Sequence, residues 1–370
     1  MQRVFVLGKN KERLSPCTPA RARKLLFKNK AAVFRQFPFT IILKERETGN
    51  TQPLYFKIDQ GSKTTGISLV SINKNSNKVI YACNLVHRGH AISESLTKRR
   101  AIRSSRRSRK TRYRKPKWTN TMSKKQFEHI NKRPKGWLAP SIKSRLDNTV
   151  NLFNKLNKLT PITNVSIENV RFDMQKLSKS KSALNKKRFT LFSKVLKGVK
   201  PSLKDAAAVN SIRNALINSF NLPIELGSGG LTKYNRKQNN YPKEHWIDAA
   251  CVGLSGEEIH IPTSLIPVEI KANGRGSRQM CRVDKNGFPR TSAKKASNKF
   301  NFKTGDIVIA KVKKGKKQGT YLGRVAVRES GYFNITKKSG VVQGISYQDC
   351  RLLHKNDGYS YSNLVNLITT

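Results

Sequence analysis

The sequence predicts an α/β protein whose core is one mixed sheet, flanked by a small N-terminal domain and a β-rich C-terminal domain. Between residues 53 and 254, the apolar patterns of strands and helices follow one another as strand, strand, strand, helix, strand, helix, strand, helix. Hydrophobic residues make up 36% of the 370 residues, which is lean but sufficient for a buried core. Two or three domains fit this length.

The N-terminal domain is expected at residues 1–52. A short strand is predicted at 4–7, and Pro19 is well placed in the first turn of a helix over 20–29. An apolar run then covers 33–43 around Pro38.

The core begins with three β-rich runs at 54–59, 65–72 and 78–87. Turn-forming residues around Gly61 and in 73–77 separate them, so we expect an antiparallel meander. A helix over 141–159, a strand at 163–168, a helix over 205–220, a strand at 222–226, a tight turn at 227–230 and a helix over 244–253 follow. This is the order of the RNase H-type nuclease fold. From residue 255, short strands at 306–312, 320–327 and 332–335 predict the β-rich C-terminal domain.

The charge of the chain points to a polyanionic partner. Lysine and arginine number 75 against 21 aspartates and glutamates, which gives a net charge of +54. No apolar run approaches the roughly 18–20 residues of a membrane-spanning helix, and residues 1–7 are too short for a signal peptide. The five cysteines form no CxxC pair, which argues against disulfides and a cysteine zinc site and favours the reducing cytoplasm. Nucleic acid is therefore the expected partner, rather than a membrane.

An arginine-rich run at 98–117 carries 12 cations in 20 residues and no acid. A helix through it has no apolar stripe to bury, so phosphates on several sides would hold it better than a protein core. The alternative is a solvated basic tail. Five members of the run recur at three- and four-residue steps and share one helix face: Arg99, Arg103, Arg106, Lys110 and Arg114. These five and Arg107 are the candidate nucleic-acid ligands.

Three acids are placed where an RNase H-type sheet would bring them together. Asp59 ends the first strand, Glu168 ends the fourth strand, and Asp248 lies in the last helix, three residues after His245. Neighbouring carboxylates repel, and hard cations relieve the repulsion, so two Mg²⁺ ions, with Mn²⁺ as a substitute, are expected there. Such a pair drives in-line phosphodiester displacement, with His245 as base or water-orienting group. The ordinary alternative is that each acid is a cap or a turn acceptor.

Residues 227–236 read GSGGLTKYNR and give a second, weaker signal. A glycine turn lets backbone amides approach a phosphate, which Lys233 and Arg236 could neutralise. A plain strand-to-helix turn is the alternative.

At these positions the chain resembles the IscB/IsrB family. Residues 57–66 (KIDQGSKTTG), 166–173 (SIENVRFD), and 227–236 with 245–253 (HWIDAACVG) resemble its three RuvC motifs. The arginine run resembles its bridge helix, and residues 15–26 (SPCTPARARKLL) resemble its PLMP domain, although the naming tetrapeptide reads RLSP at 13–16. No histidine lies between His129 and His245, so the HNH nuclease of IscB has no place and the chain resembles IsrB.

The resemblance implies a division into a PLMP-like domain (1–52), RuvC segments at 53–92, 119–173 and 205–254, a bridge helix (93–118), a basic linker (174–204) and a C-terminal domain (255–370). It implies an RNA-guided DNA endonuclease of the prokaryotic cytoplasm and nucleoid, a monomer that binds a long guide RNA (ωRNA). The enzyme would nick the displaced strand of double-stranded target DNA beside a short flanking motif. The C-terminal domain would read that motif, and the candidates for this role are Arg275, Arg278, Arg282 and the lysines of 311–317.

Two other functions stay open. The chain could be an RNA-guided DNA-binding protein whose catalytic site is idle. It could also be a basic structural RNA-binding protein of the ribosomal type, which explains the charge but not three acids in RNase H order.

Overall fold

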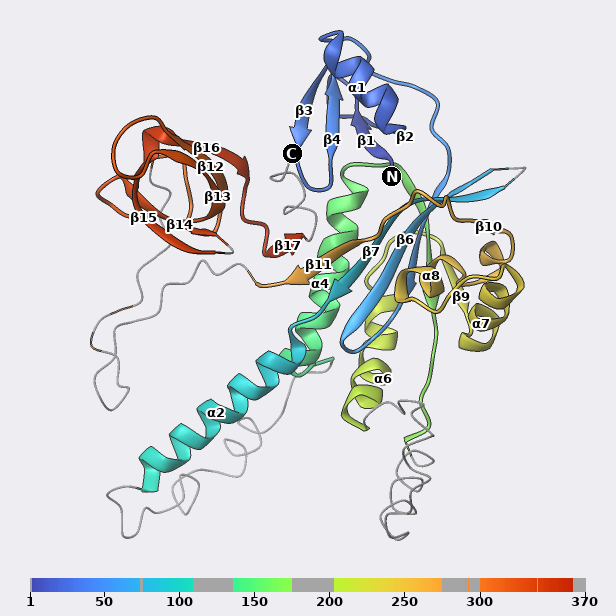
Figure 1. Ribbon diagram of the computed structural model, residues 1–370. Coiled ribbons are helices and arrows are strands. Elements are labelled where there is room, and N and C mark those ends of the chain that lie inside the picture. The colour runs from blue at the N-terminus through green and yellow to red at the C-terminus, as the bar shows by residue number, and fades with distance from the viewer. Residues whose placement is uncertain are drawn as a thin grey trace, which may run out of the picture.

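The computed structural model describes residues 2–73, 76–108, 136–174, 203–274, 290, 292, 300–337 and 339–361. Within them the chain is mixed α/β and has three sheets (Figure 1). The predictions for the end of the arginine run and for the basic linker at 174–204 fall almost entirely outside these residues. No helix among the described residues is long and apolar enough to cross a membrane.

The N-terminal sheet has the order β2-β1-β4-β3, from β1 (Val4–Leu7), β2 (Arg13–Cys17), β3 (Ala31–Arg35) and β4 (Thr40–Leu43). Helix α1 (Pro19–Phe27) packs against it, and the predicted strand at 4–7 is confirmed. Thr18 caps α1 by accepting a hydrogen bond from the Arg21 amide, and Pro19 occupies the first turn, where no amide is needed.

Among the described residues, the central sheet has eight strands. Its main path is β17-β11-β7-β6-β5-β8-β9, and β10 (Ile259–His260) pairs with β7 off this path. Strands β5 (Leu54–Asp59), β6 (Thr64–Ile72) and β7 (Asn77–Val86) are antiparallel, so the predicted meander is confirmed. Strands β8 (Ile162–Glu168) and β9 (Ile224–Gly227) run parallel to β5.

Helices cover both faces of this sheet (Figure 1). On one face, α4 (Pro140–Asn157) and α6 (Leu203–Ile217) bury apolar residues such as Phe153 and Leu216 against Phe56 and Ile58 of β5. On the other face, α8 (His245–Ala250) packs Trp246 against β6 and β7. Side chains alternate along a strand, so residues 57 and 59 of β5 point toward α8.

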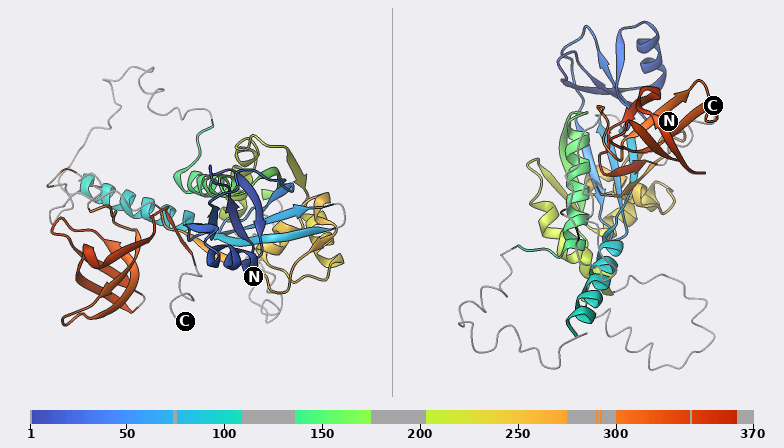
Figure 2. Two further views of the ribbon diagram at one scale, coloured as in Figure 1. Left: turned by 90° about the horizontal axis from the view of Figure 1, so that it is seen from above. Right: turned by 90° about the vertical axis from the view of Figure 1, so that its left-hand side faces the viewer.

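Helix α2 (Gly89–Ser108) begins at the end of β7 and projects away from the sheet (Figure 2). It packs against α4 near its start, and from Ser93 on its described side chains are exposed. The arginine run is thus helical as far as the described residues reach, and no described core covers it.

The C-terminal sheet has the order β15-β14-β13-β12-β16 and is entirely antiparallel. It is formed by β12 (Ile307–Val312), β13 (Gly319–Ala326), β14 (Tyr332–Lys337), β15 (Gly340–Ser346) and β16 (Cys350–His354) around a small apolar core. The three strands predicted here are confirmed.

The structure differs from expectation in several elements. The helices expected over 205–220 and 244–253 end earlier, at Ile217 and Ala250. Residues 255–370 do not form one separate unit, because β11 (Val268–Ala272) is parallel to β7 and β17 (Tyr359–Tyr361) is antiparallel to β11. Both strands extend the central sheet, which satisfies backbone groups that an open edge would leave unpaired. The turn expected at 227–230 is instead followed at once by helix α7 (Gly229–Gln238).

Candidate active site

The strand register brings two of the predicted acids to one end of the sheet. Ile58 pairs with Ile167 across the parallel β5–β8 ladder, so Asp59 and Glu168, the next residues on each strand, lie side by side. Parallel strands present their carboxyl ends at the same edge, and both side chains face α8.

Helix α8 brings the other two predicted residues to the same place. The Ser68 hydroxyl donates to the Trp246 carbonyl at 2.7 Å and ties the helix to β6. Gly66 lies directly beneath: a Cβ at this position would lie 2.8 Å from Trp246 N and closer still to the His245 carbonyl. Because residue 66 has no side chain, α8 approaches closely enough for His245 Nδ1 to lie 3.2 Å from Asp59 Oδ2.

The charge of Asp59 shifts the pKa values of Glu168, His245 and Asp248. Burial, then the charge of Asp59 and a hydrogen bond with it, raise the pKa of Glu168 to about 8. Burial and the charge of Asp59 also raise the pKa of Asp248. The hydrogen bond to Asp59 raises the pKa of His245. The predicted acids and histidine are therefore one electrostatically coupled cluster.

Arg236 of α7 lies against this cluster. Its Nε is 2.7 Å from Asp248 Oδ1, a charge contact without the alignment of a hydrogen bond, and both side chains are mostly buried. The guanidinium therefore faces a carboxylate. Lys233, on the same helix, is exposed.

The donor set suits a hard divalent cation, because it consists of carboxylate oxygens that repel one another. No group of three or more His, Cys, Asp or Glu side chains among the described residues is arranged as a metal site. Instead, Glu168 shares a hydrogen bond with Asp59, and Asp248 is paired with Arg236. The hydrogen bond between the two carboxyls and the guanidinium of Arg236 relieve the repulsion among the acids. A bound cation would relieve the same repulsion in their place.

The other predicted nucleic-acid ligands are spread over the surface. Arg99 and Arg103 are exposed on α2. Arg106 and Arg107 lie on the same helix, where their side chains are not described, and Lys110 and Arg114 lie outside the described residues, as do Arg275, Arg278 and Arg282. The lysines of 311–317 are exposed at the β12–β13 hairpin.

A known protein family matches the part of the chain that holds two of the predicted acids. The family described as RRXRR protein matches residues 4–188. The chain belongs to this family. The RRXRR family is the one associated with proteins of IscB/IsrB type, and the match includes Asp59, Glu168 and the arginine-rich helix α2. No curated protein matches the chain.

This RRXRR protein also places residues at the site that the sequence analysis did not single out as functional. Lys57 is fully buried two residues before Asp59, and burial lowers its pKa to about 8 against the raising effect of Glu225. Glu225 and Asn235 contact the segment after α8. The available signal was the spacing of two residues between Lys57 and Asp59, which puts both on one face of a strand.

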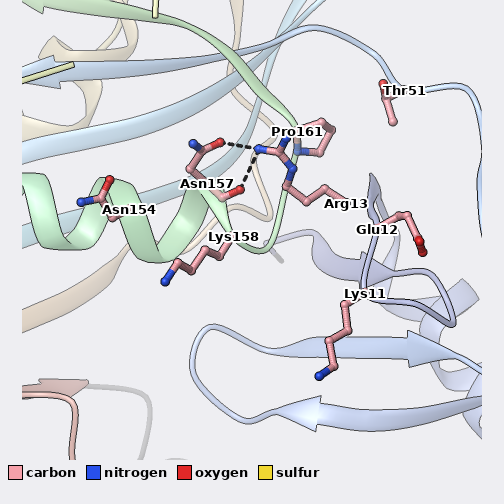
Figure 3. A pocket seen from close by; sticks show the side chains of 8 residues that line it. All are labelled: Lys11, Glu12, Arg13, Thr51, Asn154, Asn157, Lys158 and Pro161. Atoms are coloured by element: carbon pink, nitrogen blue, oxygen red, sulfur yellow. Dashed lines mark hydrogen bonds between the residues drawn. The ribbon is translucent and has the colours of Figure 1, made fainter. Parts of the chain in front are cut away.

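A pocket of about 850 Å³ lies elsewhere in the RRXRR protein, between the N-terminal sheet and the end of α4 (Figure 3). Arg13 Nη1 donates to the Asn157 carbonyl at 3.1 Å and to Asn157 Oδ1 at 2.8 Å. The lining also includes Lys11 and Lys158, and it shares no residue with the acid cluster.

Proposed function

We propose that this protein is an RNA-guided, Mg²⁺-dependent DNA endonuclease of the IsrB type, which nicks the displaced strand at a RuvC site. The observation that carries the proposal is the meeting of Asp59, Glu168, Asp248 and His245, which come from three separate elements, β5, β8 and α8. The order of the first five core strands, β7-β6-β5-β8-β9, with β8 and β9 parallel to β5, is the order we associate with an RNase H-like core. The exposed cations of α2 favour a nucleic-acid substrate.

Each residue has a distinct part. Asp59, Glu168 and Asp248 would hold Mg²⁺, which stabilises the attacking and leaving oxygens of a phosphodiester displacement. Asp59 also binds His245 Nδ1, which fixes the imidazole and leaves Nε2 to take a proton from water. Arg236 holds the Asp248 carboxylate in place.

A nick rather than a double-strand break is expected because the residues that the structure describes offer one such cluster, and because no histidine that an HNH domain would need lies between His129 and His245. Base pairing of the guide would choose the target, while the basic surface would hold the backbone of the heteroduplex.

The test uses the full chain expressed with its flanking locus, so that the co-purified RNA can be sequenced. We expect supercoiled plasmid carrying a matching target to become nicked circle, not linear, only with guide and Mg²⁺. Asp59→Ala should abolish nicking and keep guide and target binding, whereas the exposed Glu258→Ala should nick as the native protein does. Target binding without cleavage by the native protein would favour the idle binder, and binding of generic RNA without preference would favour the structural RNA-binding protein.

A further inference from the structure

A second row of polar side chains lies directly beneath the acids. Lys57 pairs with Ser166 across the β5–β8 ladder, and Ser166 pairs with Glu225 across the β8–β9 ladder. The row above consists of Asp59, Glu168 and Gly227, and each residue of the lower row precedes one of these by two positions on the same strand. Both rows therefore face α8.

The lower row holds the segment that follows α8. Lys57 Nζ donates to the Val252 carbonyl at 2.8 Å. Glu225 accepts from the Ser255 amide at 2.9 Å and from the Ser255 and Ser166 hydroxyls, both at 2.5 Å. The segment 251–255 is thus tied to β5 and β9 by side chains of opposite charge.

Asn235 of α7 ties the same segment from the other side. Its amide donates to the carbonyls of Cys251, at 3.0 Å, and Gly253, at 2.9 Å. A Cβ at Gly227 would lie 2.6 Å from the Gly253 amide nitrogen, so the segment lies on the end of β9 as closely as backbone can. Gly253 has a φ of 74°, which favours glycine at this position.

Helix α8 depends on these contacts for its position. It spans six residues, too few to be stable alone, so its ends must be fixed by tertiary contacts. Ser68 and Gly66 fix the beginning, as described above, and the lower row fixes the segment just after the end. The Lys57 ammonium binds the Val252 carbonyl two residues after the last residue of α8, and its positive charge suits the C-terminal end of a helix.

From this arrangement we propose that Lys57 and Glu225 are positioning residues that lock α8 in place, so that Asp248 and His245 meet Asp59 and Glu168. Neither contacts the reacting atoms. Lys57 is fully buried, so leaving its charge without the carboxylate of Glu225 is costly, whereas the pair with its hydrogen bonds is tolerated. The inference rests on the proposed function for its kinetic consequence, but not for its structural one.

The test compares Lys57→Met, Glu225→Gln and the double variant with Lys271→Met, whose side chain is exposed on β11. In metal-free protein, we expect amide hydrogen exchange at 245–255 to rise at least about tenfold in each single variant, while the meander of β5, β6 and β7 stays protected. The nicking rate constant should fall about 10²-fold, because a displacement of about 1 Å in an active site costs that much, with target Kd unchanged. Lys271→Met should change neither.

The double variant separates positioning from stability. Removing both charges should recover much of the melting temperature that a single variant loses, but neither the nicking rate nor the exchange protection of 245–255. Recovery of all three, loss of protection across the whole sheet with an unchanged rate per folded molecule, or no change at 245–255 would each overturn the proposal. If the native protein does not nick, the proposed function fails, and the exchange data alone still decide whether the lock exists.

Discussion

Gly66→Ala tests the placement of α8 most directly. Gly66 is paired with Asp59 across the β5–β6 ladder, and α8 crosses over it. An added Cβ would lie 2.8 Å from Trp246 N and closer to the His245 carbonyl. Both obstacles are backbone, which cannot rotate aside as a side chain would, so α8 and β6 must separate.

The magnitude follows from that overlap. Ordinary Cβ contacts begin near 3.4 Å, so the helix must move by about 1 Å or more, a displacement that costs on the order of 10² in rate at an active site. Overpacking of this kind lowers the free energy of unfolding by about 1–3 kcal/mol. Gly66→Ala should therefore unfold at lower urea and, under conditions where it is folded, nick about a hundredfold more slowly.

Urea unfolding and plasmid nicking at saturating Mg²⁺ measure the two effects. Gly49→Ala is the matched control, because the three atoms nearest to its added Cβ belong to the guanidinium of Arg46, the far end of a flexible side chain. It should match the native protein in both assays. A Gly66→Ala protein with native stability and native nicking rate would show that α8 does not lie against β6 as described, and the assignment of His245 and Asp248 would fall with it.

Two further predictions concern the rest of the chain. Asp357 is mostly buried and binds Lys155, Arg35 and His354. Burial alone would raise the pKa of Asp357, but hydrogen bonds from His354 and Lys155 lower it. The carboxylate therefore stabilises the fold above the pKa of an unfolded aspartate, near pH 4, and this stabilisation is lost as the pH falls below that value. Asp357→Asn should cost about 3–5 kcal/mol at pH 7, and the gap in melting temperature from the native protein should shrink below about pH 4; a gap independent of pH would contradict this reading. Replacing Arg99 and Arg103 together by Gln should weaken RNA binding and reduce its salt slope by about 1–2, whereas the exposed Lys28 and Lys30 replaced in the same way should do so less. Equal effects in filter binding across a salt series would reduce α2 to one basic surface among others.

Periodicity predicted the elements whose signal is local. The strand at 54–59 agrees with β5 at both ends, and the helix expected over 141–159 agrees with α4 within two residues at each end, because each carries its own apolar pattern. Helix α7 was missed because Gly229 and Gly230 open it, and glycine is a poor helix former. It forms because Ser228 caps it, accepting from the Leu231 amide, and because Thr232 and Asn235 are buried.

Long-range pairing was beyond what periodicity can reveal. Strand β17 spans only Tyr359–Tyr361, and its partner β11 lies at Val268–Ala272. The local sequence pattern of either strand therefore does not predict that it belongs to the central sheet. The same holds for the site: three acids at element ends were visible in the sequence, whereas the role of Lys57 depends on Val252, which is nearly 200 residues away.

The two rows of residues on β5, β8 and β9 differ in how their charges are balanced. At the upper row, burial and Asp59 raise the pKa of Glu168, and Asp248 of α8 is paired with Arg236, so a bound cation would take over the relief of this repulsion. In the lower row, Lys57 and Glu225 are balanced by each other and by fixed hydrogen bonds, so their arrangement does not depend on what the upper row binds. A protein with a net charge of +54 attracts phosphate over much of its surface. The proposed cleavage at one point would therefore require a rigid and locally acidic site, and the role proposed for the lower row is to supply that rigidity.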